Sequence, residues 1–423
     1  MNLQLPKGTR DFSPEEKILR DKIVNTLKEV FELYGYAPLE TPVLERFEVL
    51  SSKYAGGAEI LKETFKLKDQ GSRELGLRYD LTVPLARYIG MNQTIKMPFK
   101  RYQIGEVFRD GPVASARYRQ FLQCDVDVVG SSSMAIDAEI AALIDAAFKK
   151  LDFDIIIKIN SRKLLNDILD YCGIEKEKQE NVILSIDKLE KFGIGTVKNE
   201  LKGQNVDDSK ISKILDILNI KGSNNEKISQ LKKLLKNSEG LNEIEQLLGY
   251  LKNINLEADF DASLARGLAY YTGTVIEAYL KNSSVKSSVC AGGRYDKIIG
   301  AFLGKNEIPT VGVSFGVDRI YDALIEKEKI LQRTKTKIYI IPIKTLNESM
   351  KVAQQLRGGG INTDIDLLDK GPSKNLEYAN SLGIPFVLFV GKKELQEGKL
   401  KLRDMKSGKE EMVNFDDIIK KIK

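Results

Sequence analysis

The sequence predicts an α+β core with an antiparallel sheet, a helical insertion inside that core, and a small C-terminal α/β domain. Three observations lead to this fold class. Residues 63–130 contain strand-like runs separated by turns, without a helix between each pair. Residues 161–255 place Leu, Ile and Lys at helical spacing. From residue 337 onward, strand runs alternate with helical stretches, which favours a mostly parallel sheet.

The elements of the core follow from periodicity. Residues 15–34 carry apolar side chains at helical spacing and predict a helix. GYAPLETPVLE, with Pro38 and Pro42, predicts a short extended piece. The next strand runs are FKLKD, LGLRYDLT, FKRYQIGEVFRD and RQFLQCDVDVVG, and residues 134–150 predict a helix.

Strand signal returns after the insertion with GTVIEAYL and SSVCAGG, and VGVSFGVDRIYDALI reads as a strand turning into a helix. In the C-terminal domain, KIYIIPI, INTDIDL and PFVLFVG are strand runs, and LRGGGI fits a helix end with a turn. The predicted boundaries are 1–325 for the core, 161–255 for the insertion, 326–336 for a linker and 337–423 for the last domain.

Composition limits the classes of protein. The 423 residues suffice for two or three domains, and 42% hydrophobic with 30% charged residues is typical of a soluble globular protein. The three cysteines are not closely spaced, which favours a reducing compartment over a disulfide framework or a cysteine zinc site. The N-terminus lacks an apolar signal core and no stretch is long enough to span a membrane, so we expect a cytoplasmic protein.

The chain contains no histidine. Catalysis by Ser-His-Asp or Cys-His and metal binding by histidine are therefore excluded. Phosphoryl or adenylyl transfer suits the remaining Lys, Arg, Asp and Glu, because it depends on positioning and charge neutralisation. Of the net charge of +6, five charges lie from Lys335 onward, where 17 basic residues face 12 acidic ones. That surface fits an acidic partner such as a nucleic acid, and equally a solvated lysine-rich face.

Two polar clusters lie in the first half of the chain. In LRYDLTVPLARYI, a strand reaching Thr82 would place Arg78, Asp80 and Thr82 on one face, able to hold an ammonium group or merely solvated. In FRDGPVASARYRQFLQCDVDVVG, strand pairing would bring three arginines together, which favours a phosphate ligand over a plain charged surface. These arginines are Arg109, Arg117 and Arg119, and the side chains that follow them on one strand face are Gln123, Asp125 and Asp127.

Two further clusters lie in the second half. LARGLAYYTGTVIEAYL places Arg266 among apolar residues just before Tyr270 and Tyr271. A buried arginine needs an anion, either a ligand or an internal carboxylate such as Asp261. In CAGGRYDKIIGAF the paired glycines permit close backbone approach. Arg319 follows at the start of a helix, and the glycine spacing fits neither a P-loop nor a Rossmann motif.

In this order the clusters resemble a class II aminoacyl-tRNA synthetase, and specifically the histidyl-tRNA synthetase family. LPKGTRDFSPEE resembles its N-terminal opening, FELYGYAPLETPVLE its motif 1, residues 100–130 its motif 2, and GVSFGVDRI its motif 3. LARGLAYYTGTVIEA resembles a histidine-specific signature. LRGGGINTDIDLL and YANSLGIPFVLFVGKKELQEGKLKLRDMKSG resemble the anticodon-binding domain. The resemblance implies the class II synthetase fold and a homodimer with Pro42 at its interface.

The resemblance also implies a ligase of protein biosynthesis that uses ATP with Mg²⁺ to join L-histidine to tRNA(His). Histidine carboxylate would attack ATP to give histidyl-adenylate, and the terminal ribose of the tRNA would then take the aminoacyl group. Arg266 and Arg109 would be catalytic. The implied histidine-binding residues are Asp80, Thr82, Gln123, Asp127, Arg266, Tyr270 and Tyr271, and the implied ATP-binding residues are Arg109, Arg117 and Arg319.

The chain departs from the family pattern at three places. Ala269 stands where Asp is common, Gly111 stands where a glutamate usually meets adenine, and the motif 2 loop has Ala114, Ser115 and Ala116 where glycine is common. Two other functions fit the same motifs: a non-catalytic synthetase-like regulatory subunit of histidine biosynthesis, and a class II synthetase for another amino acid. The missing histidine is either chance or a way to translate the enzyme when charged tRNA(His) is scarce, and translation under histidine starvation tests this.

Overall fold

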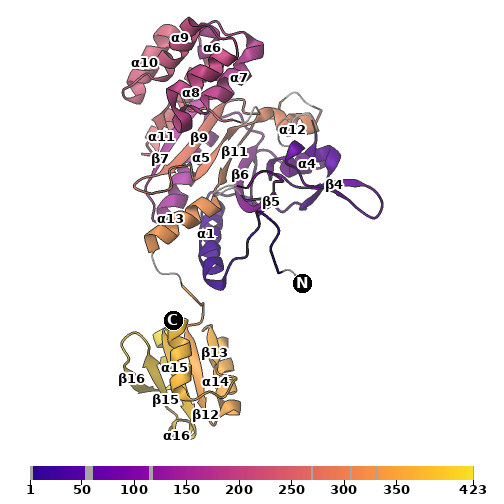
Figure 1. Ribbon diagram of the computed structural model, residues 1–423. Helices are drawn as coiled ribbons and strands as arrows, with labels where there is room; N and C mark the ends of the chain where they lie inside the picture. The colour runs from indigo at the N-terminus through magenta and orange to yellow at the C-terminus, as the bar shows by residue number, and fades with distance from the viewer. Residues whose placement is uncertain are drawn as a thin grey trace. The chain divides into compact units, whose positions relative to one another are not determined.

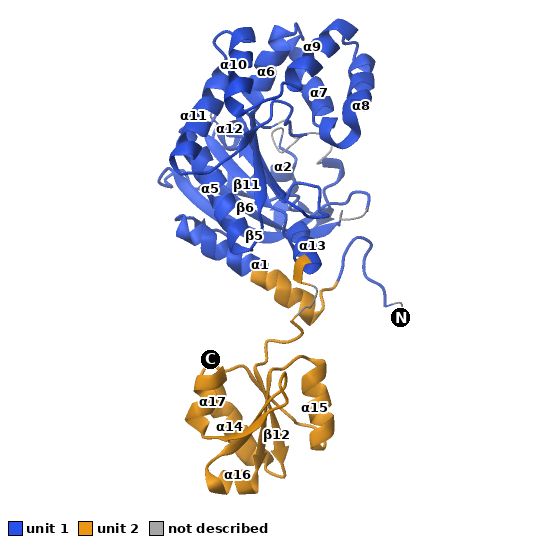
Figure 2. Cartoon of the chain, turned by 90° about the vertical axis from the view of Figure 1, so that its left-hand side faces the viewer, with its two compact units in different colours: residues 1–10, 23–326 blue, residues 11–22, 327–423 orange. Residues whose placement is uncertain are grey.

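The computed structural model describes residues 3–52, 61–113, 118–267, 270–304, 307–328 and 332–422. The chain forms two compact units, the first made of residues 1–10 and 23–326 and the second of residues 11–22 and 327–423 (Figure 2). Each unit contains its own main sheet (Figure 1). The boundaries at residues 325 and 337 stay a prediction of the sequence.

The main sheet of the first unit is largely antiparallel, as predicted. Its outermost pairs, β1 with β5 and β7 with β8, are parallel, and the pairs between them are antiparallel. In spatial order, its strands in the described residues are β1 (Ala37–Pro38), β5 (Phe99–Phe108), β6 (Gln120–Val129), β11 (Thr310–Phe315), β10 (Cys290–Arg294), β9 (Thr274–Leu280), β7 (Ile155–Ser161) and β8 (Asp259–Phe260).

Helices pack on this sheet through apolar faces. α5 (Met134–Lys150) buries Ile140, Leu143 and Phe148, and the Phe148 ring stacks on Phe315 of β11 with a centroid distance of 5.9 Å. Ser133 caps this helix by accepting a hydrogen bond from the Ala135 amide at 3.3 Å. Further helices are α1 (Pro14–Leu33), whose residues up to Lys22 are grouped with the second unit, α12 (Asp296–Phe302), which packs on α4 (Thr82–Met91), and α13 (Val317–Glu328).

The strand predicted for LGLRYDLT is shorter than expected. β4 (Glu74–Leu77) ends before Arg78, and α4 (Thr82–Met91) begins at Thr82. The prediction that Arg78, Asp80 and Thr82 share a strand face was therefore wrong. Asp80 Oδ1 accepts the backbone amides of Thr82 and Val83, each at 3.0 Å, and this local capping starts a helix where the strand would continue. β4 pairs instead with β2 (Leu44–Arg46), which runs into α2 (Phe47–Leu50), and with β3 (Lys66–Lys68).

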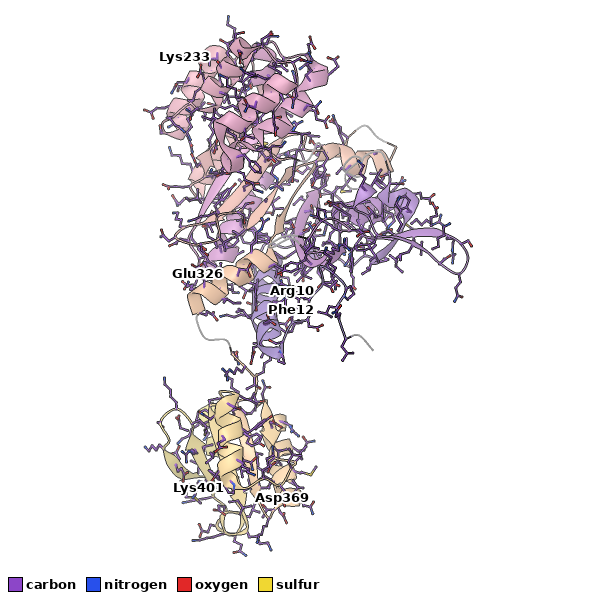
Figure 3. The ribbon with its side chains drawn as sticks, viewed as in Figure 1. Arg10, Phe12, Lys233, Glu326, Asp369 and Lys401 are labelled. Carbon is purple, nitrogen blue, oxygen red and sulfur yellow. The ribbon has the colours of Figure 1, made fainter. Side chains whose placement is uncertain are left out.

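Helices fill the predicted insertion. Their apolar faces pack on one another, and α11 also packs against α5 and β7 of the core. Ser223 and Glu226 form a capping box at the start of α10, and Lys233 is exposed in the last turn of the same helix (Figure 3). The helices are α6 (Arg162–Tyr171), α7 (Lys176–Ile186), α8 (Leu189–Gly203), α9 (Asp208–Leu218), α10 (Asn224–Leu234) and α11 (Glu239–Asn253).

The second unit has a mixed sheet. β13, β12 and β14 are parallel, as predicted, whereas β15 and β16 form an antiparallel hairpin that the sequence analysis did not resolve. The strands in order are β13 (Thr363–Ile365), β12 (Ile338–Ile343), β14 (Phe386–Gly391), β15 (Leu400–Asp404) and β16 (Glu410–Val413). The helices are α14 (Leu346–Gly358), α15 (Pro372–Ser381), α16 (Lys392–Glu397) and α17 (Phe415–Ile422).

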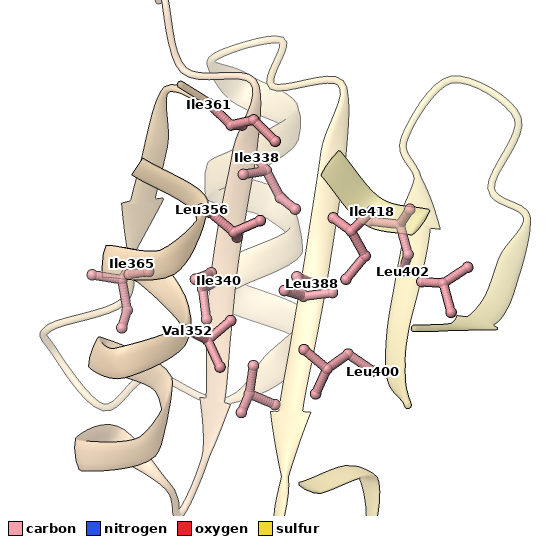
Figure 4. Packing of buried hydrophobic residues seen from close by; sticks show 13 residues of the cluster. Ile338, Ile340, Val352, Leu356, Ile361, Ile365, Leu388, Leu400, Leu402 and Ile418 are labelled. Atoms are coloured by element: carbon pink, nitrogen blue, oxygen red, sulfur yellow. The ribbon is translucent and has the colours of Figure 1, made fainter. Parts of the chain in front are cut away.

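Both faces of this second sheet are covered. Alternate side chains of β12 point to opposite faces, so Ile338 and Ile340 join one apolar cluster while Tyr339 and Ile341 join another. Figure 4 shows the first cluster, in which Leu388 is fully buried. The near-continuous apolar runs of β12 and β14 follow from burial on both faces. In the described part of the chain, no helix has the length and apolar character needed to cross a membrane.

Candidate active site

A buried polar cluster lies between β5 and β6 of the first unit. Arg101 on β5 is directly opposite Asp127 on β6, and Arg101 Nη2 lies 2.7 Å from Asp127 Oδ2. The Arg101 side chain is 0% exposed. The other oxygen of Asp127 accepts a hydrogen bond from the Tyr295 hydroxyl. Asp125, two residues away on the same strand, shares this cluster, so the predicted common face of Asp125 and Asp127 is present.

A glycine makes room for Asp127. Gly312 on β11 is its cross-strand partner, and a Cβ at Gly312 would lie 1.8 Å from Asp127 Oδ1. No side chain fits there without displacing the carboxylate. The glycines of CAGGR act similarly: a Cβ on Gly292 would lie 2.0 Å from the Gly312 carbonyl oxygen. The close strand approach predicted for this glycine pair is therefore present.

Burial shifts the titration of both carboxyls. Burial, followed by the charge of Asp127, raises the pKa of Asp125 to about 7. Burial also raises the pKa of Asp127, while Arg101 and the Tyr295 hydroxyl oppose that shift. Of the two carboxyls, Asp127 has the ion pair and Asp125 has none among the described residues. Asp125 is therefore the one that more readily takes up a proton near neutral pH.

Asp80 lies close to the same cluster. Burial raises the pKa of its carboxyl, and the charges of Arg109 and Arg101 lower it. The charge of Asp80 in turn raises the pKa of both Asp125 and Asp127. Although the strand prediction failed, the loop before α4 brings Asp80 within electrostatic reach of Arg101, Asp125 and Asp127. Thr82 follows it as the first residue of α4.

Three tyrosines line this region. The rings of Tyr270 and Tyr271 have centroids 4.7 Å apart, and Tyr270 meets Tyr295 edge to face at 6.1 Å. Burial, followed by the neighbouring Tyr271 and Asp80, raises the pKa of Tyr270 well above its ordinary value. Tyr270 and Tyr295 thus remain neutral hydrogen-bonding groups beside Asp80 and Asp127.

Arg266 has an internal carboxylate partner, but not the one expected. Its Nη1 pairs with Glu277 Oε1 on β9, whereas Asp261 pairs with Lys158 at 3.3 Å. The suggestion of Asp261 was therefore wrong. Burial disfavours the charged guanidinium, but Tyr271 and Glu277 outweigh it, so the pKa of Arg266 is raised. The Arg266 side chain keeps 23% exposure and can reach a ligand.

The helical insertion contacts the segment that carries Arg266. The Gly267 backbone amide donates to the Asp187 carboxylate at the end of α7. The Tyr279 hydroxyl hydrogen-bonds both Glu277 and, at 3.0 Å, Glu190 of α8. A chain of contacts therefore runs from the insertion through Tyr279 and Glu277 to Arg266.

The predicted phosphate-binding arginines lie on neighbouring segments. The Arg109 guanidinium lies over the rings of Tyr79 and Phe121, at 4.3 and 4.8 Å from their centroids. Arg119 pairs with the Asp110 carboxylate at 3.3 Å. Arg117, like Ala269 and the loop residues 114–116, lies outside the described residues.

Arg319 lies near the start of α13, as predicted, and its Nη1 donates to the Ser288 carbonyl oxygen at 2.5 Å. Burial, followed by the charge of Arg266, lowers the pKa of Arg319. Gln123 lies on the same face of β6 as Asp125 and Asp127, as predicted from strand alternation, and its amide donates to the Ser314 hydroxyl at 3.5 Å. Charge interactions thus link Arg109 to Asp80, and Arg266 to Arg319.

A carboxylate from another segment fills the space beside Gly111. A Cβ at Gly111 would lie 2.6 Å from Glu63 Oε1, so the carboxylate of Glu63 occupies the space that a side chain at 111 would need. Tyr79, which also contacts Arg109, donates to Glu63 Oε2 at 3.3 Å. The absence of a side chain at 111 is thus matched by a carboxylate from another segment.

Sequence reasoning missed Arg101, Tyr295 and Glu63. The signal for Arg101 was a charged residue inside a strand run, and Tyr295 lies two residues after Gly293, in the CAGGRYDKIIGAF segment already considered. Glu63 carried no local signal, because its position beside Gly111 depends on pairing between distant segments.

Comparison with known proteins decides the family. Residues 8–320 match the family model of histidyl-tRNA synthetase, and residues 337–423 match the anticodon binding domain. Histidine–tRNA ligase 1 of Bacillus cereus is 45% identical over 421 residues, which cover 97% of each chain. The chain belongs to the histidyl-tRNA synthetase family.

Solved structures agree with this assignment. The crystal structure of histidyl-tRNA synthetase from Nostoc sp. PCC 7120 has a TM-score of 0.88 at 32% identity and covers 100% of this chain and 99% of its own. A Bacillus halodurans protein described as an ATP phosphoribosyltransferase regulatory subunit/histidyl-tRNA synthetase has a TM-score of 0.77 at 22% identity, over 92% and 99% of the two chains. That lower identity shows a shared fold alone.

Membership in the histidyl-tRNA synthetase family confirms the predicted class of enzyme, an aminoacyl-tRNA synthetase, and the predicted fold with its C-terminal anticodon-binding domain. The regulatory-subunit alternative has less support, because relatives that are 43–45% identical over nearly the whole chain are histidine–tRNA ligases. The family implies the use of ATP. The roles of individual site residues stay predictions.

Proposed function

We propose that this chain is a histidine–tRNA ligase that activates L-histidine with ATP and transfers it to tRNA(His). The observation that carries the proposal is a cluster of buried polar side chains in which Asp80 interacts with both Asp127 and Tyr270, and Arg266 interacts with Tyr270 and Tyr271. Such a cluster offers carboxylates and hydroxyls to a small molecule that carries a cation and a polar ring. The family supplies the chemistry that these groups serve.

Asp80 would take the ammonium group of histidine, with Thr82 and Gln123 beside it. Asp127 and Tyr271 would bind the two ring nitrogens, while Tyr270 lines the pocket. Because these polar groups are buried, an analogue without ring nitrogens would leave them unpaired. A site of this kind rejects apolar side chains strongly.

The activation step needs charge neutralisation more than proton transfer. A histidine carboxylate oxygen attacks the α-phosphorus of ATP, the bond from that phosphorus to the bridging oxygen breaks, and pyrophosphate leaves. Arg109 would hold the α-phosphate and Arg319 the γ-phosphate, with Arg117 as a further ATP contact. Arg266 would lie between the histidine carboxylate and the α-phosphate, stabilising the charge on both as they meet.

The transfer step uses the terminal ribose of the tRNA. Its hydroxyl oxygen attacks the carbonyl carbon of histidyl-adenylate and loses its proton, and AMP leaves. The pocket residues Asp80 and Asp127 would keep the aminoacyl group fixed during the attack. Neither step requires a histidine side chain from the enzyme, so the composition of the chain fits the reaction.

Mg²⁺ would bind mainly through the phosphates of ATP. In the described residues, no group of three or more Cys, Asp or Glu side chains is placed to hold a metal ion. This fits an ion that keeps phosphate oxygens and water as ligands and takes few from protein. When bound, Mg²⁺ offsets the negative charge of the phosphates that the arginines also face.

Glu63 would compensate for Gly111. The family commonly has a glutamate at this position of motif 2 that meets the adenine amine, and here the Glu63 carboxylate lies in that space. A carboxylate there accepts a hydrogen bond from the amine whichever segment supplies it. Adenine recognition would then be kept with its carboxylate moved to another part of the chain.

The partners follow from the same family. We propose a cytoplasmic homodimer with Pro42 at its interface, and the apolar Val43 and Leu44 beside it are 38% and 49% exposed. Apolar side chains left exposed in this way suit a surface that another copy covers. The second unit would bind the anticodon stem through its basic surface.

Single arginine substitutions test the assigned roles. Arg266→Ala should lower kcat of ATP–pyrophosphate exchange by about 100- to 1,000-fold, because its contact forms chiefly in the transition state. Arg319→Ala should raise the KM for ATP more than the KM for histidine. Arg73→Ala, at an exposed arginine that pairs with Asp69, is the matched control. An Arg266→Ala enzyme with nearly wild-type kcat would contradict the assignment.

A further inference from the structure

Arg101 connects two parts of the pocket that come from different elements. One nitrogen, Nη2, pairs with Asp127 Oδ2 of β6 at 2.7 Å and also lies 3.3 Å from the Leu81 carbonyl oxygen. Leu81 stands between Asp80 and Thr82 at the start of α4. A single guanidinium therefore contacts the segment proposed for the ammonium end of histidine and the carboxylate proposed for its ring.

Charge gives Arg101 a second effect on the pocket. Asp80, Asp125 and Asp127 are acidic groups within electrostatic reach of one another, and Arg101 is the fully buried cation among them. Burying carboxylates without a cation favours their protonated forms. With Asp125 protonated, the charges of Asp80, Asp127, Arg101 and a bound histidine ammonium sum to zero.

We propose that Arg101 is a positioning residue for histidine recognition, which keeps Asp127 ionised and oriented toward the imidazole and ties it to the Asp80 segment. The proposal rests on the proposed function for the identity of the ligand. Arg101 does not touch the reacting atoms in this account, and it acts through Asp127.

This role predicts a pH dependence with a definite sign. Burial raises the pKa of Asp127 and Arg101 lowers it, so removing the arginine should leave Asp127 partly protonated at neutral pH. Histidine binding by the variant should then recover, relative to wild type, as pH rises. The titratable or charged groups that face Asp127 are Tyr36, Asp80, Arg101, Asp125 and Tyr295.

The test compares Arg101→Met and Arg101→Lys with the wild type. Arg101→Met keeps most of the volume and removes the charge, and it should raise the KM for histidine by roughly 10- to 100-fold in pyrophosphate exchange. The KM for ATP should stay within about threefold of wild type. The histidine KM ratio of variant to wild type should fall between about pH 6 and pH 9. Arg101→Lys should recover part of the loss.

A double variant distinguishes an effect of Arg101 through Asp127 from a general loss of stability. If Arg101 acts through Asp127, then Arg101→Met in an Asp127→Asn background should change the histidine KM by less than about threefold. If the two substitutions raise the histidine KM by factors that multiply, as for independent sites, the proposal is overturned. Arg294→Met is the matched control, since Arg294 is equally buried but bonds Asp137, Ser131 and Ser133. It should lower the melting temperature without a selective effect on histidine.

Different results contradict the role of Arg101 and the proposed function of the chain. Histidine binding is also measured directly by calorimetry, with wild type and Arg101→Gln, a second neutral variant that replaces Arg101→Met if Arg101→Met does not fold. Equal histidine affinity in both proteins, or equal increases in the KM for histidine and for ATP, would overturn the role of Arg101. Histidine binding by wild type without pyrophosphate exchange would instead contradict the proposed function and leave the binding comparison valid.

Discussion

Asp125→Asn should make the protein more stable at alkaline pH. The carboxyl of Asp125 is buried beside Asp127, and burial followed by that charge raises its pKa from 3.8 to about 7. A carboxyl whose pKa is raised by folding holds its proton more tightly in the folded state. Its contribution to stability is therefore present at low pH and is lost as pH rises through about 7. Asparagine has nearly the same shape and does not titrate.

The magnitude follows from the size of the shift. Each pKa unit corresponds to about 1.36 kcal/mol, so between pH 5 and pH 8 the advantage of the asparagine variant should grow by about 3 kcal/mol. For a unit of this size that corresponds to roughly 5 °C in melting temperature. Urea unfolding of both proteins across this pH range measures the difference, with thermal unfolding as the second probe.

Asp170→Asn is the opposite-sign control for this experiment. Although burial opposes it, hydrogen bonds from Lys176 and Gln179 lower the pKa of Asp170, so its contribution to stability is already complete above its ordinary pKa. The control should cost stability by a constant amount between pH 5 and pH 8. A stability difference for Asp125→Asn that is also flat over that range would refute the reasoning.

Two further predictions concern contacts around the phosphate region. Tyr279→Phe removes the hydroxyl that joins Glu277 to Glu190. It should lower kcat of ATP–pyrophosphate exchange by about 3- to 10-fold while leaving the melting temperature nearly unchanged. An unchanged kcat would show that the insertion does not position Arg266. Glu63→Gln should raise the KM for ATP by roughly 10-fold with no change in the KM for histidine, measured by exchange, and an ATP KM equal to wild type would exclude the adenine role.

The fold was predictable where local patterns decide structure. The helices at 134–150 and across 161–255 follow helical spacing, and the antiparallel pairing of β5 with β6 follows two strand runs around a turn. The failure at Asp80 has a local cause as well, because two backbone hydrogen bonds to one carboxylate started a helix inside an expected strand. Side-chain capping of this kind is hard to distinguish from strand continuation by alternation alone.

The candidate site was only partly predictable for a different reason. Motif residues such as Asp127 and Arg266 could be selected from their types and spacing, but their partners come from distant segments. Glu277, and not Asp261, pairs with Arg266, and Arg101 reaches Asp127 through the strand register. Register and tertiary packing decide such contacts, and a single sequence does not fix them.

The measurement that tests the account most directly is ATP–pyrophosphate exchange with each standard amino acid in turn. The account predicts exchange with histidine alone, supported by the polar pocket around Asp127, and loss of that exchange in Asp127→Ala. Exchange with a different amino acid, or no exchange by a folded protein that binds histidine, would contradict it.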